Sequence, residues 1–114
     1  MEDLLIEKLS MLGYPVRLQG SLLPDEPYPD HFFTFWNNDS SSDGFYDNSE
    51  TKVVYDYDVN FYSVNPEYTY SKLREAIKLL KEAGFIISGD GYSVASDEQT
   101  HDGRGFNAQY VRRI

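Results

Sequence analysis

The chain has 114 residues, no cysteine and a formal net charge of −9. Its length fits one domain, residues 1–114, which is large enough to bury a core, and without cysteine it has neither disulfides nor thiolate metal ligands. The excess of acid argues against a reader of duplex DNA and against an anionic membrane surface as partner, because both carry negative charge. No run approaches the ~20 apolar residues of a membrane-spanning helix, and acidic residues stand where a secretory signal would be basic.

The charge is unevenly distributed along the chain. Residues 1–70 hold 3 Lys and Arg against 13 Asp and Glu, a balance of −10, whereas residues 71–114 hold 7 against 6, a balance of +1. A solvated acidic half accounts for this pattern. A dipolar protomer that stacks head to tail with copies of itself is the alternative interpretation, although such asymmetry alone is common.

The first third of the chain predicts one helix and two extended segments. Leucines recur at helical spacing over residues 3–12, and a glycine follows them as a C-terminal cap would. We expect a short extended segment over 14–20 and a loop over 21–30, where three prolines rule out a central strand. The aromatic run over 31–37 predicts a strand that is covered on both faces.

The clearest strand follows a polar stretch, residues 38–50, which we interpret as a loop. Over residues 51–63, apolar and aromatic side chains alternate with polar ones, which is typical of an antiparallel strand with one wet face. Asp56 and Asp58 lie on the wet face. Paired carboxylates can perform acid–base chemistry, but here we interpret them as solubilising groups that also protect the strand from unwanted pairing.

A second helix is predicted to begin at Asn65-Pro66, with Asn as N-cap and Pro at the first helical position. Its apolar stripe includes Leu73, Ile77 and Leu80, and Gly84 closes it.

The remaining segments are short. Residues 85–88 and 92–96 are predicted to form a hairpin around a Gly-Asp-Gly turn. A polar loop over 97–105 leads to a last alternating strand over 106–113. The element order α-β-β-β-α-β-β-β predicts an α+β fold, an antiparallel sheet with two helices packed on one face.

One motif matches the spacing of a calcium-binding EF-hand loop. Asp39, Ser41, Asp43, Gly44 and Glu50 stand at the first, third, fifth, sixth and twelfth positions. An EF-hand requires a helix on each side, and here strands are predicted on both sides. We therefore interpret residues 39–50 as a polar hairpin loop and predict no metal site.

No other set of residues has the spacing of catalytic machinery. His31 and His101 are the only histidines, and neither stands in a triad-like or metal-binding pattern, so we predict structural or solvated roles for both. The sequence thus predicts neither an enzyme nor a bound cofactor. Arg104 lies between two glycines, which we interpret as a turn that exposes a mobile arginine. The possible interface residues lie in the two polar loops: Arg104, Asp39, Asp43 and Asp102.

Three stretches of the chain resemble a known family: LGYPVRLQGSLLPDEPYPDHFFTFWNND, VYDYDVNFYSVNPE and LLKEAGFIISGDGYSVASDEQTHDGRGFNAQY. They are similar to the tail terminator, or tail-completion, proteins of long-tailed phages and prophages of Gram-positive bacteria. The resemblance covers most of the chain and rests on overall pattern, since these stretches contain no catalytic signature.

The resemblance implies a homo-oligomeric ring, with six as the expected number of copies. Such a ring would cap the tail tube, bind the tail-tube protein and join it to the head connector protein. It would be found in the virion, and in the cytoplasm of the bacterial host during assembly. No specific nucleic-acid binding is implied, because an acidic surface near a channel would repel DNA phosphates. The alternatives are another head–tail connector component and a small prophage-encoded protein-binding module.

Overall fold

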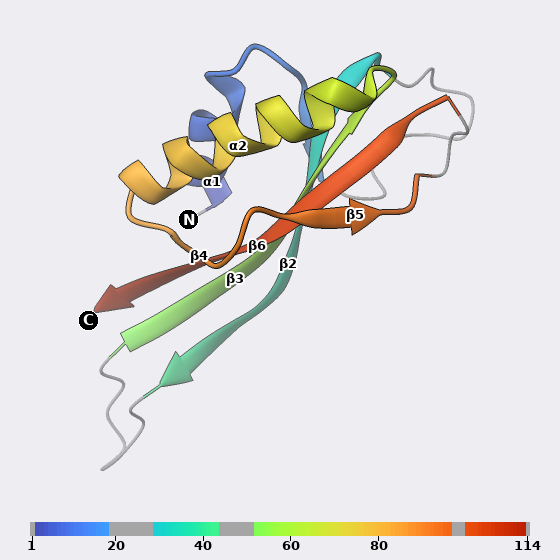
Figure 1. Ribbon diagram of the computed structural model, residues 1–114. Coiled ribbons are helices and arrows are strands. Elements are labelled where there is room, and N and C mark those ends of the chain that lie inside the picture. The colour runs from blue at the N-terminus through green and yellow to red at the C-terminus, as the bar shows by residue number, and fades with distance from the viewer. Residues whose placement is uncertain (1, 19–28, 44–51, 97–99, 114) are drawn as a thin grey trace.

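The computed structural model describes residues 2–18, 29–43, 52–96 and 100–113 (Figure 1). Two helices and six strands form an α+β fold, as predicted. In chain order they are α1 (Glu2–Ser10), β1 (Val16–Leu18), β2 (His31–Asp43), β3 (Lys52–Ser63), α2 (Pro66–Glu82), β4 (Ile86–Ile87), β5 (Tyr92–Val94) and β6 (Asp102–Arg113).

All six strands belong to one sheet of order β1-β2-β3-β6-β4, in which β5 also pairs with β6. The three long strands are antiparallel, so the predicted antiparallel arrangement holds for the body of the sheet. The pair β1–β2 is parallel, which makes the sheet mixed. A parallel pair needs a longer connection than a hairpin turn, and the chain between Leu18 and His31 supplies it.

The predicted hairpin over residues 85–96 is wrong. β4 and β5 do not pair with each other; β4 pairs with Ala108 and Gln109 of β6, and β5 pairs with residues 103–105 of the same strand. Both flanking glycines of the turn have positive φ, +77° at Gly89 and +98° at Gly91. The chain therefore runs along one edge of β6 instead of folding back on itself.

Two strands are longer than predicted, at the expense of the expected polar loops. β2 continues to Asp43: after a bulge at Asn38, residues 39–43 pair with β3. β6 begins at Asp102, so most of the loop expected over 97–105 is strand. In both places the partner strand supplies backbone hydrogen bonds that the polar composition does not reveal.

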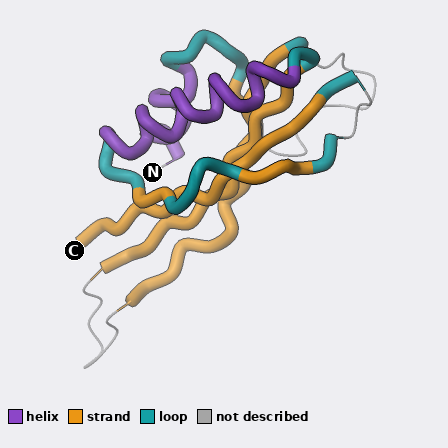
Figure 2. Tube along the Cα trace, viewed as in Figure 1, coloured by secondary structure: helices purple, strands orange, loops and turns teal. Residues whose placement is uncertain are grey.

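Both helices cover the same face of the sheet, as predicted (Figures 1 and 2). The Asn65 side chain accepts a hydrogen bond from the Glu67 N–H at 3.1 Å and caps α2, with Pro66 at the first helical position. The buried core between helices and sheet includes Leu5, Leu9, Phe33, Phe35, Tyr57, Val59, Phe61, Leu73, Ala76, Ile77, Leu80, Phe106 and Ala108.

The sheet extends beyond this core. The part that extends is formed by residues 39–43 of β2, 52–56 of β3 and 109–113 of β6, which are paired with one another. We call this part of the sheet the extension. Its described side chains are half-buried or exposed, and none is fully buried. In Figure 1 the lower ends of β2 and β3 run on past both helices.

The substitution Ile77→Ala tests this packing. Ile77 is buried against the sheet, so its truncation is expected to lower the free energy of unfolding by about 2–5 kcal/mol. Lys78→Ala, at the neighbouring exposed position of the same helix, is expected to change it by less than about 0.5 kcal/mol. Chemical denaturation of both variants measures the difference, and equal stabilities would contradict the placement of the apolar stripe.

Candidate functional site

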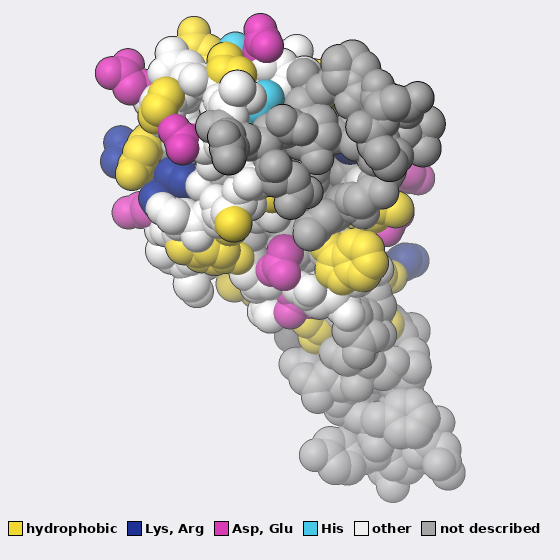
Figure 3. Space-filling view, turned by 90° about the vertical axis from the view of Figure 1, so that its right-hand side faces the viewer, with side chains coloured by type: hydrophobic (Ala, Val, Ile, Leu, Met, Phe, Trp, Pro, Cys, Tyr) yellow, Lys and Arg dark blue, Asp and Glu magenta, His cyan; other side chains and the backbone are white. Residues whose placement is uncertain are grey.

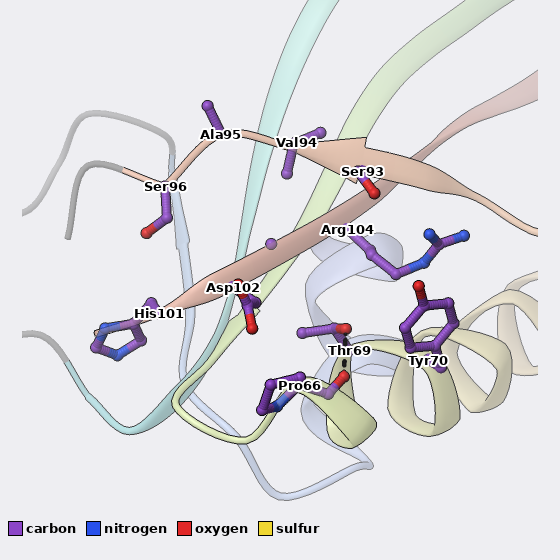
Figure 4. A pocket seen from close by; sticks show the side chains of 11 residues that line it. Pro66, Thr69, Tyr70, Ser93, Val94, Ala95, Ser96, His101, Asp102 and Arg104 are labelled. Carbon is purple, nitrogen blue, oxygen red and sulfur yellow. Dashed lines mark hydrogen bonds between the residues drawn. The ribbon is translucent and has the colours of Figure 1, made fainter. Parts of the chain in front are cut away.

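A hollow of about 420 Å³ lies between the start of α2 and the strands β5 and β6 (Figure 4). Arg104 and Asp102 both line it from β6, and Tyr70 and Thr69 line it from α2. In Figure 4 the Arg104 side chain reaches toward Tyr70, whereas Asp102 points toward the beginning of the helix. Two of the four predicted interface residues thus share one site.

Arg104 is not the mobile loop residue that the sequence suggested. It lies within β6, half-buried, and its guanidinium carbon stands 4.3 Å from the centre of the Tyr70 ring. Its Nε is buried without a hydrogen-bond partner. A cation over an aromatic face is stabilised by the ring quadrupole. The interaction holds this arginine against α2 and removes much of its freedom to reorder on a partner.

The glycines beside Arg104 are strand residues and not a turn. A Cβ at Gly103 would lie 2.8 Å from the Tyr62 ring, and a Cβ at Gly105 would overlap the Asn60 amide oxygen. The side chains of Tyr62 and Asn60 therefore lie across β6 on the face that is turned away from the helices. Glycine is required because another strand's side chains occupy the space of its own.

The two histidines have structural contacts. His101 is buried, and its Nε2 donates a hydrogen bond to the Pro29 carbonyl at 2.8 Å. The Nδ1 of His101 then accepts one from the Thr100 hydroxyl at 3.0 Å. His31 Nδ1 is 2.7 Å from the Ser63 hydroxyl, which also accepts the Asn65 N–H. These contacts join distant segments around the start of α2.

The sheet face opposite the helices carries a polar cluster centred on Asp56. Its carboxylate accepts hydrogen bonds from the side-chain amides of Asn38, Asn107 and Gln109. Asn107 also donates to Asp58 at 3.2 Å. Partial burial raises the pKa of Asp56, but the three hydrogen bonds outweigh burial and hold this pKa below its usual value. The two aspartates are thus tied into a network and are not simply solvated.

Large apolar side chains border this cluster. Trp36 stands beside Asp58 in the register of the sheet and is 49% exposed, and Ile86 is 55% exposed beside Gln109. Burial, together with the charges of Asp58 and Asp56, raises the pKa of Tyr92. Figure 3 shows one side of the molecule, on which exposed hydrophobic side chains stand among acidic ones without forming one continuous patch.

The other two predicted interface residues lie elsewhere. Asp39 and Asp43 belong to β2 in the extension, where Asp39 pairs with Asp56, whereas Asp102 pairs with Ser63. Asp56 and Ser63 are seven residues apart in β3, so Asp39 and Asp102 are separated by roughly 23 Å along the strand direction. The structure therefore does not bring the four residues together.

The calcium motif also lacks the conformation of an EF-hand. Its first, third and fifth positions lie in β2 and are paired with β3, so they cannot wrap around an ion as a loop does. Gly44 and Glu50 lie outside the described residues. Within the described part of the chain, no helix is both long and apolar enough to cross a membrane.

No protein-family model fits this chain, and no curated protein matches it in sequence. The residues themselves, their arrangement and the resemblance described above are therefore the indications of function that this chain offers.

A Cβ at position 105 is expected to destabilise the sheet. Gly105→Ala would overlap Asn60 and place a methyl group 3.0 Å from the Val59 carbonyl oxygen, at a cost of about 1–3 kcal/mol. Combining it with Asn60→Ala removes the overlap, so the double variant should lose less stability than the sum of the two single variants. Strict additivity in denaturation experiments would contradict the crossing of Asn60 over β6.

The Asp56 network predicts a specific pH dependence. Because the folded-state pKa of Asp56 is lowered, its carboxylate stabilises the protein above its unfolded-state pKa, and this stabilisation is lost as the pH falls through the folded-state value. Asp56→Asn is expected to cost about 1 kcal/mol at neutral pH and to flatten the fall in stability between about pH 5 and pH 3. Asp90→Asn, in an exposed turn, is the control and should leave the profile nearly unchanged.

Proposed function

We propose that this chain is a phage virion assembly protein, a tail terminator or tail-completion protein that forms a ring on the end of the tail tube and joins it to the head connector. The resemblance of three long stretches to that family motivates the proposal. In this proposal the protein acts by assembly and not by catalysis, first in the host cytoplasm and then in the virion.

The observation that best supports assembly is the extension. It is a three-stranded sheet in which Tyr55 and Tyr110 still pack against the core, whereas the half-buried apolar residues Val53, Val54 and Val111 lie beyond it. Val54 and Val111 are paired in register on the face opposite the helices. Apolar side chains on a projecting sheet are suited to a protein interface, where they would leave water on binding.

The charge distribution also supports a ring around a DNA channel. Carboxylates on a channel wall would repel phosphates and let the genome slide without binding. The acidic cluster of Asp56 and Asp58 lies on the open face of the sheet, which is one surface that such a wall could use. The hollow beside Arg104 is better suited to the alternative, a small protein-binding module.

Growth of tail tubes in the presence of this protein tests the proposal. Electron microscopy is expected to show shorter tubes with density on one end when the protein is present. Unchanged tube length and bare ends would overturn the tail-terminator proposal and favour the protein-binding module. Density along the side of the tube would instead favour another connector component.

A pair of variants tests whether the extension makes this contact. Val54→Asp places a charge on the extension and is expected to reduce capping by at least about tenfold, because a charge would be buried without a partner. Ser71→Asp places the same charge at an exposed position of α2 and should cap like the parent protein. Thermal melting of both variants shows that each remains folded, and equal capping by the two would contradict a role for the extension.

A further inference from the structure

The extension has a free edge on each side. β1 pairs with β2 only at Phe33–Phe35, and β4 and β5 pair with β6 only at residues 103–105 and 108–109. Among the described strands, none therefore pairs with the outer edge of residues 39–43 of β2 or of residues 110–113 of β6. At the second edge the side chain of Tyr110 is contacted by Phe85 and Gly84. Each edge presents backbone N–H and C=O groups that can pair with a further strand.

The two edges carry opposite charge. The β2 edge contains Asp39 and Asp43 and no basic residue, whereas the β6 edge contains Arg112 and Arg113 and no acidic residue. The edges are also level with each other, because Asp43 pairs with Lys52 and Lys52 pairs with Arg113. The opposite charges are thus located on two individual strand edges. They are more specific than the difference in net charge between residues 1–70 and residues 71–114.

We propose that the β6 edge of one copy pairs with the β2 edge of a second copy, so that the sheet continues from copy to copy. Backbone hydrogen bonds would supply affinity, as in other cases of strand addition. The charges would select the partner edge, because like charges facing each other oppose association. Pairing β2 with β2 would bring four aspartates together, and pairing β6 with β6 would bring four arginines together.

Strand direction agrees with a head-to-tail arrangement. β2 and β6 are each antiparallel to β3, so they run parallel to one another within a copy. If copies are repeated around an axis that runs roughly along the strands, every copy keeps the same strand direction. The new pair, β6 of one copy with β2 of the next, would therefore be parallel. A contact between two different edges is heterologous, and it closes into a ring or continues as a filament. The inference deepens the proposed function by naming the contact that builds the ring, but it depends on the sheet alone.

Cysteine cross-linking tests the contact, because the chain has no cysteine of its own. Ser41→Cys and Val111→Cys are made in separate full-length proteins, one of them carrying a size tag. Both positions pair with Val54 and so lie on the same face of the sheet. The two proteins are mixed at high concentration and low salt and then oxidised. A mixture of Ser71→Cys with Val111→Cys is the control for random collision.

The mixed Ser41–Val111 disulfide is expected to exceed either homodimer and the control by roughly tenfold, and to decrease at high salt. A predominant Ser41–Ser41 or Val111–Val111 product would overturn the proposal in favour of a two-fold contact. Cross-linking no greater than the control would also overturn it. The charges would then act only to keep the edges apart, as charged residues on exposed edges commonly do.

Charge exchange provides a second test that does not depend on cysteine geometry. Asp39→Arg with Asp43→Arg, in the cross-linking background, should abolish the mixed product, and Arg112→Asp with Arg113→Asp should do the same. A chain with all four substitutions has both edges reversed and should regain the product. Failure of the four-fold variant to recover, while it melts like the parent, would show that the edges do not meet.

The tail-tube experiment separates this inference from the proposed function. Mixed disulfides without any effect on tubes would support the edge contact and refute the tail terminator. Capped tubes without mixed disulfides, with tubes present during oxidation, would support the tail terminator and refute the edge contact.

Discussion

The structure depends on the pairing of β3 along its whole length with a long strand on each side. The register from Lys52 to Ser63 decides which side chains of three strands face the helices and which face away. Tyr57, Val59 and Phe61 form the floor on which α2 packs, and the residues between them form the opposite surface. A slip of one residue in either ladder would exchange the two faces, so the core and the outer surface are set by the same hydrogen bonds.

The two faces of the sheet are stabilised in different ways. On the helix side, aromatic and aliphatic groups exclude water in a conventional core. On the other side, the polar side chains around Asp56 are hydrogen-bonded to one another, whereas the buried Thr34 hydroxyl has no hydrogen-bond partner among the described residues. The side chains of Asn60 and Tyr62 fit on this face only because β6 has glycine opposite each of them. Asn60 is nearly buried there, although neither α1 nor α2 covers that face (Figure 1). The side chains on that surface are therefore held in fixed positions by their neighbours. They could present a defined arrangement of polar groups to a partner.

Local signals were enough to predict the elements with strong periodicity. The Asn65-Pro66 start of α2, its apolar stripe and the alternation of β3 are each encoded within a short window, and all three were confirmed. The polar tail of β2 and the glycines of β6 were misread, because serine, aspartate and glycine usually indicate loops. Those segments are strands because β3 lies beside them and pairs with them. A local sequence pattern contains no information about that neighbouring strand.

The candidate site was harder to predict for the same reason. Arg104 looked mobile between two glycines, and its contact with Tyr70 depends on how α2 lies across the sheet. For His101 the sequence predicted a structural or solvated role, but it did not predict the hydrogen bond to a carbonyl 72 positions earlier in the chain. Asp39, Asp43, Arg112 and Arg113 were visible as charges. Their opposition at two edges became apparent only once the strand order was known.

The position of β6 in the strand order has a consequence for biosynthesis. β4 and β5 are made before β6, yet each pairs only with β6 among the described strands, and strands of two or three residues do not persist alone. β3 likewise acquires its second neighbour only when β6 arrives. A nascent chain that has completed α2 therefore exposes the side of β3 that β6 will occupy, together with the underside of the helix. During synthesis this half-built sheet is the state most open to chaperones and to misassociation.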